Sequence, residues 1–246
     1  MTCNSRIKRL VFCGLDQVVI KIGRQSATIN PMTDEKTASN PEHFGFLQVP
    51  NYSMIAFTSA IEPLRMANRD AGKELYRWSV YTIDGLPEKA SNGLEITPDD
   101  SIENAAEMSI LFVCGGADIV DAWSKQLQFA LRRIAKRNNI IIGALCTGSY
   151  LLARAGLLDG YKCTIHWENI ASLREEFPEV NVSDDLFLVD RDRITCAGGQ
   201  ASMDMMLKLI HDRHGNKLVT HISEQFMCER IRSSDDRQRI PLHLAL

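Results

Sequence analysis

The sequence predicts an α/β fold, in which a mostly parallel, doubly wound sheet is covered by helices on both faces. Two observations carry this prediction. Segments with strand character alternate along the chain with segments of helical period, which is the order of repeated strand–helix units. The segments "MSILFVC" (108–114) and "NIIIGAL" (139–145) are continuous apolar runs, as expected of strands buried on both faces of a parallel sheet.

The individual elements follow from this alternation in chain order. We expect strands at 43–49, 76–84, 108–114, 139–145 and 162–167, two short strands within 186–198 around a turn at 190–193, and an extended excursion at 92–102. We expect helices at 54–68, 119–137, from 146 or 147 onward, 168–177, 200–214 and 217–231. The composition predicts a polar extension over 1–42, one α/β domain over 43–231 and a charged linker over 232–246.

Charge and composition exclude several classes of protein. The net charge of -3 gives no basic excess, which a free-standing nucleic-acid binder needs to neutralise phosphates. No apolar run approaches the roughly 20 residues of a membrane span, and no signal peptide is expected. The seven cysteines are odd in number and irregularly spaced, which favours a reducing cytoplasm over a disulfide framework. No cofactor is expected, and no metal, because His211 and His214 lack a third ligand.

One segment has the pattern of a nucleophile elbow. In "GALCTG" (143–148) a predicted strand ends at Cys146, and the small residues Ala144 and Gly148 lie two positions before and after it. A sharp strand-to-helix turn that exposes a side chain leaves room only for small residues at those positions. A helix beginning there is expected to lower the pKa of the thiol. The alternative is a cysteine packed at a strand end.

A pair of glycines strengthens the elbow interpretation. Gly115 and Gly116 directly follow the buried strand "ILFVC". Glycines let the backbone bend close to a neighbouring site and present N–H groups to an anion or carbonyl. If this strand lies beside the strand that ends at Leu145, the pair lies next to Cys146, at the sheet edge where α/β proteins bind ligands.

Several segments resemble a known family. "FVCGGAD", "GALCTGSYLLARAGLLDGYKCTIHW" and "ITCAGGQASMDMMLKLI" resemble the ThiJ/PfpI branch of the class I glutamine-amidotransferase-like fold, a flavodoxin-like sandwich. More narrowly, they are similar to the amino-terminal domains of GlxA-type regulators in the AraC class. "NYSMIAF", "IEPLRMAN", "SEQF" and "ERIRSSDDRQRIPL" resemble regulators that respond to betaine, carnitine or arginine. The resemblance covers residues 43–246.

The resemblance implies a cytoplasmic homodimer that binds a small-molecule effector. It places a DNA-binding pair of helix-turn-helix units after the charged linker, and this chain does not contain them. DNA is therefore expected as a partner only through that absent module, and a membrane is not expected.

The resemblance also implies which residues a live catalytic site would need. Cys146 would be the nucleophile and His166 the base, together with an acidic residue on the first helix. That acidic position falls on Ala56, with Glu62 as a weaker substitute, and Thr147 stands where hydrolytic members often carry histidine. A nucleophile needs a base that is itself oriented by a third group. The sequence therefore favours a binding pocket; a cysteine hydrolase, hydratase or glyoxalase and a redox-sensing thiol remain alternatives.

The same residues predict a ligand pocket. Polar contacts for a carboxylate would come from the elbow and its surroundings: Gly115, Gly116, Cys146, Thr147 and His166. Trp167 would supply an aromatic wall suited to a quaternary ammonium group, with core packing as the alternative.

The last predicted helix carries one apolar stripe, formed by Leu218, Val219, Ile222 and Phe226. We expect this stripe to pack on the domain itself, and a dimer surface is the alternative.

Overall fold

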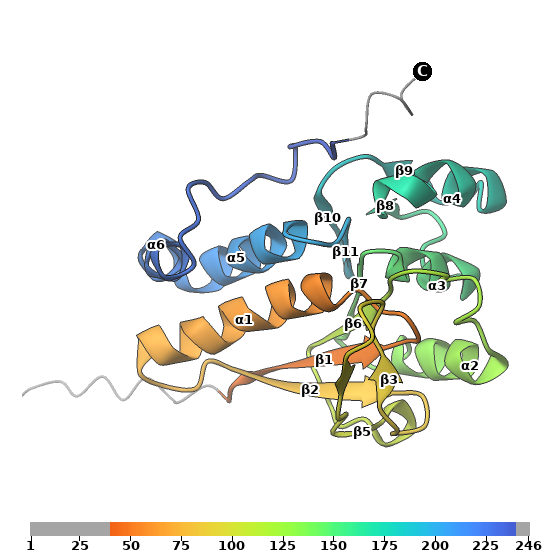
Figure 1. The fold of residues 1–246 in the computed structure, drawn as a ribbon, viewed down its shortest axis with the longest axis horizontal. Helices are drawn as coiled ribbons and strands as arrows, with labels where there is room; N and C mark the ends of the chain where they lie inside the picture. The colour runs from red at the N-terminus through yellow and green to blue at the C-terminus, as the bar shows by residue number, and fades with distance from the viewer. Residues whose placement is uncertain (1–39, 240–246) are drawn as a thin grey trace, which may run out of the picture. The chain divides into compact units, whose positions relative to one another are not determined.

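A seven-stranded sheet forms the centre of the computed structural model, which describes residues 40–239 (Figure 1). Its strands lie in the order β10-β11-β7-β6-β1-β2-β5. Their bounds are β1 (Glu42–Gln48), β2 (Tyr76–Thr82), β5 (Asp100–Ser101), β6 (Ile110–Cys114), β7 (Ile141–Leu145), β10 (Phe187–Asp190) and β11 (Arg193–Cys196). Only the β10–β11 pair is antiparallel within this sheet. The prediction of a mostly parallel sheet is confirmed.

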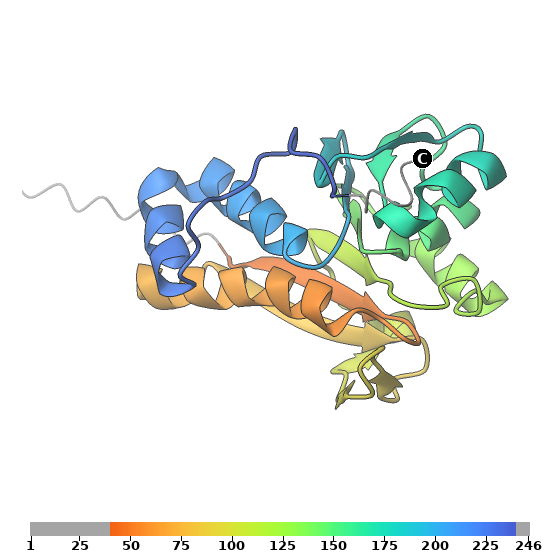
Figure 2. The same cartoon turned by 45° about the horizontal axis from the view of Figure 1, so that its top comes forward.

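Helices cover both faces of the sheet (Figures 1 and 2). One face carries α1 (Met54–Ala71), α5 (Ala201–His214) and α6 (Asn216–Gln225), and the other carries α2 (Lys125–Ile134), α3 (Gly148–Arg154) and α4 (Ile170–Glu176). Alternation along the strands divides the core: Phe44 and Phe46 of β1 pack with the first set, and Leu47 packs with the second. The fold is therefore doubly wound.

Two small sheets lie outside the central one. The excursion at 92–102 belongs to a hairpin of β3 (Glu88–Lys89) and β4 (Glu95–Ile96), and its end adds β5 to the central sheet. β8 (Lys162–Thr164) pairs in parallel with β9 (Asn181–Ser183). The 3-10 turns are η1 (Ile102–Asn104) and η2 (Trp167–Asn169). The backbone N–H of Thr164 donates to Thr195 Oγ1 at 2.9 Å, which places the end of β8 against β11.

Two helix boundaries differ from the prediction by six residues, more than the others do. The helix expected at 119–137 starts at Lys125, because Ser124 caps it by accepting from the Leu127 N–H at 3.0 Å. The helix expected to reach residue 231 ends at Gln225, and Met227 takes the left-handed φ of 53°. The Cys228 N–H then donates back to the Ser223 carbonyl, which closes the helix end.

The residues after α6 run back over the domain instead of leaving it (Figures 1 and 2). We call residues 226–239 the C-terminal strap. Arg232 pairs with the buried carboxylate of Asp204 on α5, with N···O distances of 2.9 and 2.7 Å. Further along, the Gln238 N–H donates to the Asp184 carbonyl at 3.0 Å. The charged linker expected from residue 232 is thus docked on the domain as far as residue 239. The extension predicted over 1–42 lies outside the described residues, apart from 40–42.

The apolar stripe of α6 packs on the domain, as predicted. Val219 and Ile222 are fully buried, and Leu218 and Phe226 pack against the same core cluster, which α1 and α5 also line. Burying this stripe fixes α6 beside α1 and brings the start of the strap over α5.

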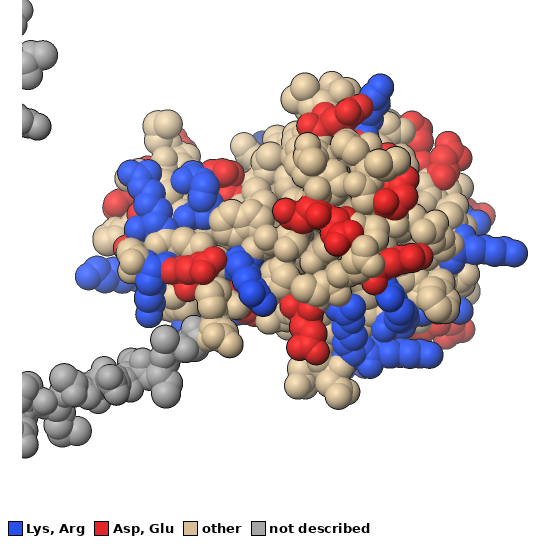
Figure 3. Space-filling model, turned by 90° about the horizontal axis from the view of Figure 1, so that it is seen from below, with Lys and Arg blue, Asp and Glu red and all other residues tan. Residues whose placement is uncertain are grey.

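Charges of both signs are interspersed on the face shown in Figure 3. This distribution agrees with the near-neutral net charge of -3. None of the helices between residues 40 and 239 is both long and apolar enough to span a bilayer.

Candidate functional site

The turn after β7 has the geometry of a nucleophile elbow. Cys146 adopts a φ of 59°, a left-handed conformation that non-glycine residues rarely hold. The chain turns into α3 two residues later, at Gly148. A Cβ at Gly148 would lie 2.2 Å from the carbonyl oxygen of Val113, so only glycine fits there. The turn therefore requires the glycine that the sequence places two positions after Cys146.

The predicted glycine pair does lie beside the elbow, because β6 and β7 are neighbours and Cys114 pairs with Leu145. The Thr147 hydroxyl donates to the Gly116 carbonyl at 2.7 Å. The Gly115 N–H donates to the Leu145 carbonyl at 3.1 Å and is therefore not free for a ligand, contrary to our expectation. These glycines permit close packing: a Cβ at Gly115 would lie 2.6 Å from Thr147 Oγ1.

His166 follows β8 and reaches the elbow through its backbone. Its N–H donates to the Cys146 carbonyl at 3.3 Å. Burial lowers the pKa of the His166 ring, an effect that the nearby Glu168 carboxylate opposes. The imidazole is therefore mainly neutral at pH 7. Within residues 40–239, no hydrogen bond joins the Cys146 thiol to the His166 ring.

The thiol of Cys146 is poorly suited to nucleophilic attack. The residue is only 8% exposed. Burial raises the pKa of this thiol to about 11, and the Glu168 carboxylate adds to the rise although the Thr147 N–H opposes it. The expectation that the helix end lowers the thiol pKa is therefore wrong, because desolvation outweighs the lowering by the Thr147 N–H at the start of α3. At neutral pH the thiol is protonated.

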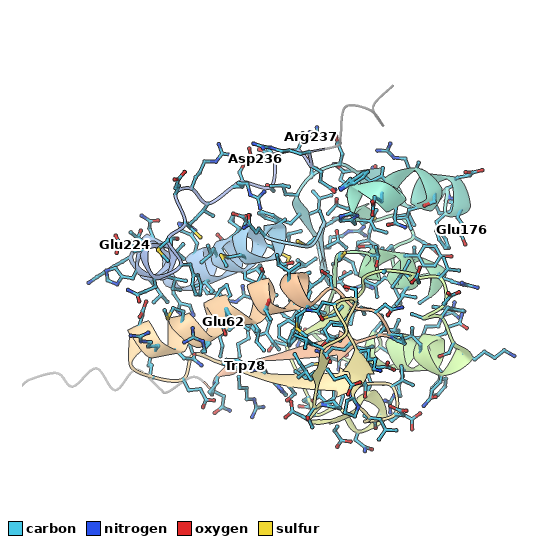
Figure 4. The ribbon with its side chains drawn as sticks, viewed as in Figure 1. Glu62, Trp78, Glu176, Glu224, Asp236 and Arg237 are labelled. Carbon is cyan, nitrogen blue, oxygen red and sulfur yellow. The ribbon has the colours of Figure 1, made fainter. Side chains whose placement is uncertain are left out.

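Helix α1 supplies no acid to the elbow. Ala56, at the position where the resemblance places a carboxylate, is buried in the core. Glu62, the substitute considered from the sequence, pairs with Arg65 at 2.6 Å and is partly exposed on α1 (Figure 4). The carboxylate nearest the histidine is Glu168, whose Oε2 lies 3.4 Å from His166 Nδ1. It is mostly exposed and follows His166 by two residues, and sequence reasoning did not single it out.

A cavity of about 250 Å³ opens beside the elbow. Its walls come from the segment after β8, the start of α5 and the strap: His166, Trp167, residues 198–201, Arg232, Gln238 and Arg239. Gly198 separates the cavity from the elbow, since a Cβ there would lie 2.7 Å from the Cβ of Cys146. Of the predicted ligand residues, His166 and Trp167 line this cavity. The others belong to the packed elbow beside it: Gly115, Gly116, Cys146 and Thr147.

The cavity wall includes residues that sequence reasoning missed. Gly198 and Gly199 repeat the signal of Gly115 and Gly116, a glycine pair after a strand, and could have been found from it. Arg232 and Gln238 could not, because nothing in a charged segment indicates that it folds back on the domain. Within residues 40–239, no group of three or more His, Cys, Asp or Glu side chains could hold a metal ion.

Comparison with known proteins identifies the family of this chain. The model of the DJ-1/PfpI family matches residues 55–212. The chain belongs to that family. A solved structure of an AraC family transcriptional regulator from Pseudomonas putida superposes with a TM-score of 0.69 at 30% identity, covering 76% of this chain and 100% of that one.

Curated proteins with similar sequences include transcriptional regulators. The HTH-type transcriptional regulator GbdR of Pseudomonas aeruginosa is 49% identical over 203 residues, 82% of this chain and 55% of GbdR. CdhR, an HTH-type transcriptional regulator of the same species, is 44% identical over 199 residues, 81% of this chain and 59% of CdhR. The chain thus spans little more than half the length of these relatives. Isonitrile hydratase of Pseudomonas putida is 27% identical over 132 residues, 54% of this chain and 57% of the enzyme.

Proposed function

We propose that this chain is the effector-sensing part of a cytoplasmic transcriptional regulator of the AraC class. The observation that carries the proposal is the cavity lined by His166 and Trp167, next to an elbow whose thiol is held protonated. Such a site can bind a small molecule but lacks an activated nucleophile. The similarity of the chain to GbdR and CdhR, over about four fifths of its length, supports a regulatory role.

The proposed effector is a small amino acid or a quaternary-ammonium metabolite such as betaine, carnitine or arginine. Trp167 offers its ring to a cationic group, and Arg239 in the same wall carries a guanidinium that can pair with a carboxylate. We place DNA binding in a module outside this chain, and assembly as a homodimer belongs to the same proposal.

A thermal-shift screen with betaine, dimethylglycine, carnitine, arginine and related amino acids tests the proposal. An effector that binds the native state raises the melting temperature by mass action. Trp167→Leu should remove most of that rise. Trp123→Leu is the matched control, because Trp123 packs against the same core cluster as Trp167 but does not line the cavity. No rise with any compound, or an equal loss in both variants, would count against the proposal.

An enzyme of the same family is the second candidate. The left-handed backbone of Cys146 and the closeness of Glu168 to His166 favour it, and isonitrile hydratase shows that such activity occurs among relatives. A redox-sensing thiol is less favoured, because a buried thiol with a raised pKa oxidises slowly. Substrate turnover that Cys146→Ser abolishes would establish the enzyme.

A further inference from the structure

The C-terminal strap supplies part of the wall of the cavity beside the elbow. Arg232, Gln238 and Arg239 of the strap line this cavity together with His166 and Trp167 of the domain. The volume of about 250 Å³ suits a ligand at the small end of the range for binding sites. A ligand bound there therefore lies against the strap and against the domain at the same time.

Two of the three strap side chains in the wall are already engaged with the domain. Arg232 donates to the Asp204 carboxylate at 2.9 and 2.7 Å, which neutralises its charge. Gln238 is 9% exposed, and its Nε2 donates to the Ile165 carbonyl at 2.9 Å. These contacts fix the backbone of the strap at residue 238, next to the cavity.

Arg239 differs from the other strap arginines in its lack of a charged partner. Within residues 40–239, Arg230, Arg232 and Arg237 each form an ion pair with a carboxylate, and Arg239 forms none. Its side chain is exposed and lines both the small cavity and the larger groove between the strap and α5. A guanidinium presents paired N–H donors in a plane that matches a carboxylate. Arg239 is thus the strap group with its charge available to a ligand.

Trp167 gives the same cavity a surface for a cationic group. Its ring centroid lies 5.5 Å from that of the His166 ring, and burial lowers the pKa of this histidine. The imidazole is therefore mainly neutral at pH 7 and does not repel a cation beside Trp167. A small zwitterion matches this wall, with its carboxylate toward Arg239 and its cationic group toward Trp167.

A ligand shifts a conformational equilibrium only through contacts that differ between the two states. An ion pair between a ligand in the cavity and Arg239 exists only while the strap is docked on the domain. By linkage, the ligand and the docked strap then stabilise each other. The strap precedes the position at which we expect the DNA-binding module, so its docking is a route by which occupancy of the cavity reaches that module.

We propose that Arg239 couples effector binding to docking of the strap: the effector carboxylate pairs with the Arg239 guanidinium, and this pair holds the end of the strap on the domain. The inference rests on the proposed function and deepens it, because it names the group that recognises the carboxylate and the segment whose position the effector controls. A cationic compound without a carboxylate binds more weakly and leaves the strap unchanged.

The first test compares ligands of the thermal-shift screen with analogues that keep the cationic group and lack the carboxylate. The pairs are betaine and choline, dimethylglycine and dimethylaminoethanol, carnitine and β-methylcholine, and arginine and agmatine. Dissociation constants are measured by isothermal titration calorimetry with the full chain. In each pair that binds, we expect the analogue to bind at least about tenfold more weakly, since a charge-assisted contact is lost. Arg239→Gln should remove most of that difference.

Arg230→Gln is the matched control. It neutralises another arginine of the strap, which pairs with Asp236 and does not line the small cavity. The tenfold preference for the carboxylate should persist in this variant.

The second test measures hydrogen exchange of strap peptides by mass spectrometry. A saturating carboxylate ligand should slow exchange over residues 233–239 by about threefold or more in wild type and in Arg230→Gln. In Arg239→Gln, at equal occupancy of the cavity, the exchange rate should not change. This measurement separates a residue that couples the ligand to the strap from one that only adds affinity.

Three outcomes would overturn the inference and leave the proposed function standing. The first is equal affinity for the two members of each pair that binds. The second is a preference for the carboxylate that Arg239→Gln keeps or that Arg230→Gln loses equally. The third is a strap whose exchange rate does not respond to a bound ligand in wild type. Failure of every compound in the screen to bind would overturn the proposed function, and this inference with it.

Discussion

Cys146 is held in a backbone conformation that costs about 1–3 kcal/mol for a non-glycine residue, yet its thiol is buried and protonated. The turn that presents the Cys146 side chain is therefore present, but the surroundings of the thiol do not favour its ionisation. The cause lies in the neighbours: Gly198 packs directly on Cys146, and Glu168 adds negative charge nearby.

The Cys146 thiol should react slowly with iodoacetamide at neutral pH. Because the thiolate is the reactive form and burial raises the pKa to about 11, the rate should keep increasing past pH 9 instead of levelling off. Mass spectrometry of the Cys146 peptide after timed alkylation measures this profile. A rate that already levels off below pH 8 would show an activated thiol.

Gly198→Ala should lower the free energy of unfolding by about 1–3 kcal/mol more than Gly160→Ala does. Both glycines have positive φ, so both substitutions strain the backbone. Only at Gly198 would the new Cβ meet another residue, 2.7 Å from Cys146 Cβ, whereas Gly160 has nothing within 4 Å. Urea unfolding of the two variants gives the comparison, and equal losses would mean that the elbow tolerates the methyl group.

At the scale of elements, contacts of Arg232, Arg237 and Gln238 hold the strap on the domain. A groove of about 1150 Å³ runs between it and α5, so the Arg232–Asp204 pair provides an anchor in a loosely packed region. The Arg232 guanidinium donates from Nε and Nη2 to Asp204 Oδ2. The backbone N–H of Arg232 donates to Asp204 Oδ1 at 2.9 Å.

Arg232→Gln should release the strap and speed tryptic cleavage after Arg230, because the freed backbone can enter the protease site. It leaves the buried Asp204 carboxylate without its charged partner, which should also lower the free energy of unfolding by about 1–3 kcal/mol. Lys208→Gln is the control, because it breaks an exposed ion pair with Asp212 on the same helix and should change neither quantity much. Timed proteolysis with mass spectrometry detects the cut. Unchanged cleavage in Arg232→Gln would mean that other contacts hold the strap.

The strands and the elbow could be predicted because their patterns are local. Apolar runs mark β6 and β7, and the small residues around Cys146 mark the turn. Helix ends were less predictable: the apolar period of α6 continues through Phe226, and nothing local indicates the left-handed Met227 that ends the helix. The cavity was harder still, because the strap reaches it through tertiary contacts such as that of Gln238 with Ile165.

At the scale of the whole molecule, buried thiols make stability depend on alkaline pH. Burial raises the pKa of Cys146 to about 11 and those of Cys163 and Cys196 to about 12. In the unfolded chain a thiol has a pKa of about 8.5. Because the folded-state pKa values are raised, the stabilisation is fully present below about pH 8.5 and is lost as pH rises toward 11 to 12.

The melting temperature under reducing conditions should therefore change little through these groups between pH 7 and 8, and fall steadily from about pH 9 upward. Differential scanning calorimetry across that range measures the trend. Cys163→Ala should make the fall shallower, because one thiol no longer ionises on unfolding. A melting temperature that stays constant to pH 10.5 would contradict the burial of these thiols.

In the proposed function, this domain binds an effector without using Cys146 as a nucleophile. Its most direct test is calorimetric titration of an effector from the thermal-shift screen into wild type and Cys146→Ser, with the recovered ligand analysed by mass spectrometry. We expect dissociation constants that agree within about twofold and an unchanged ligand in both samples. Conversion of the ligand by wild type but not by Cys146→Ser would contradict it.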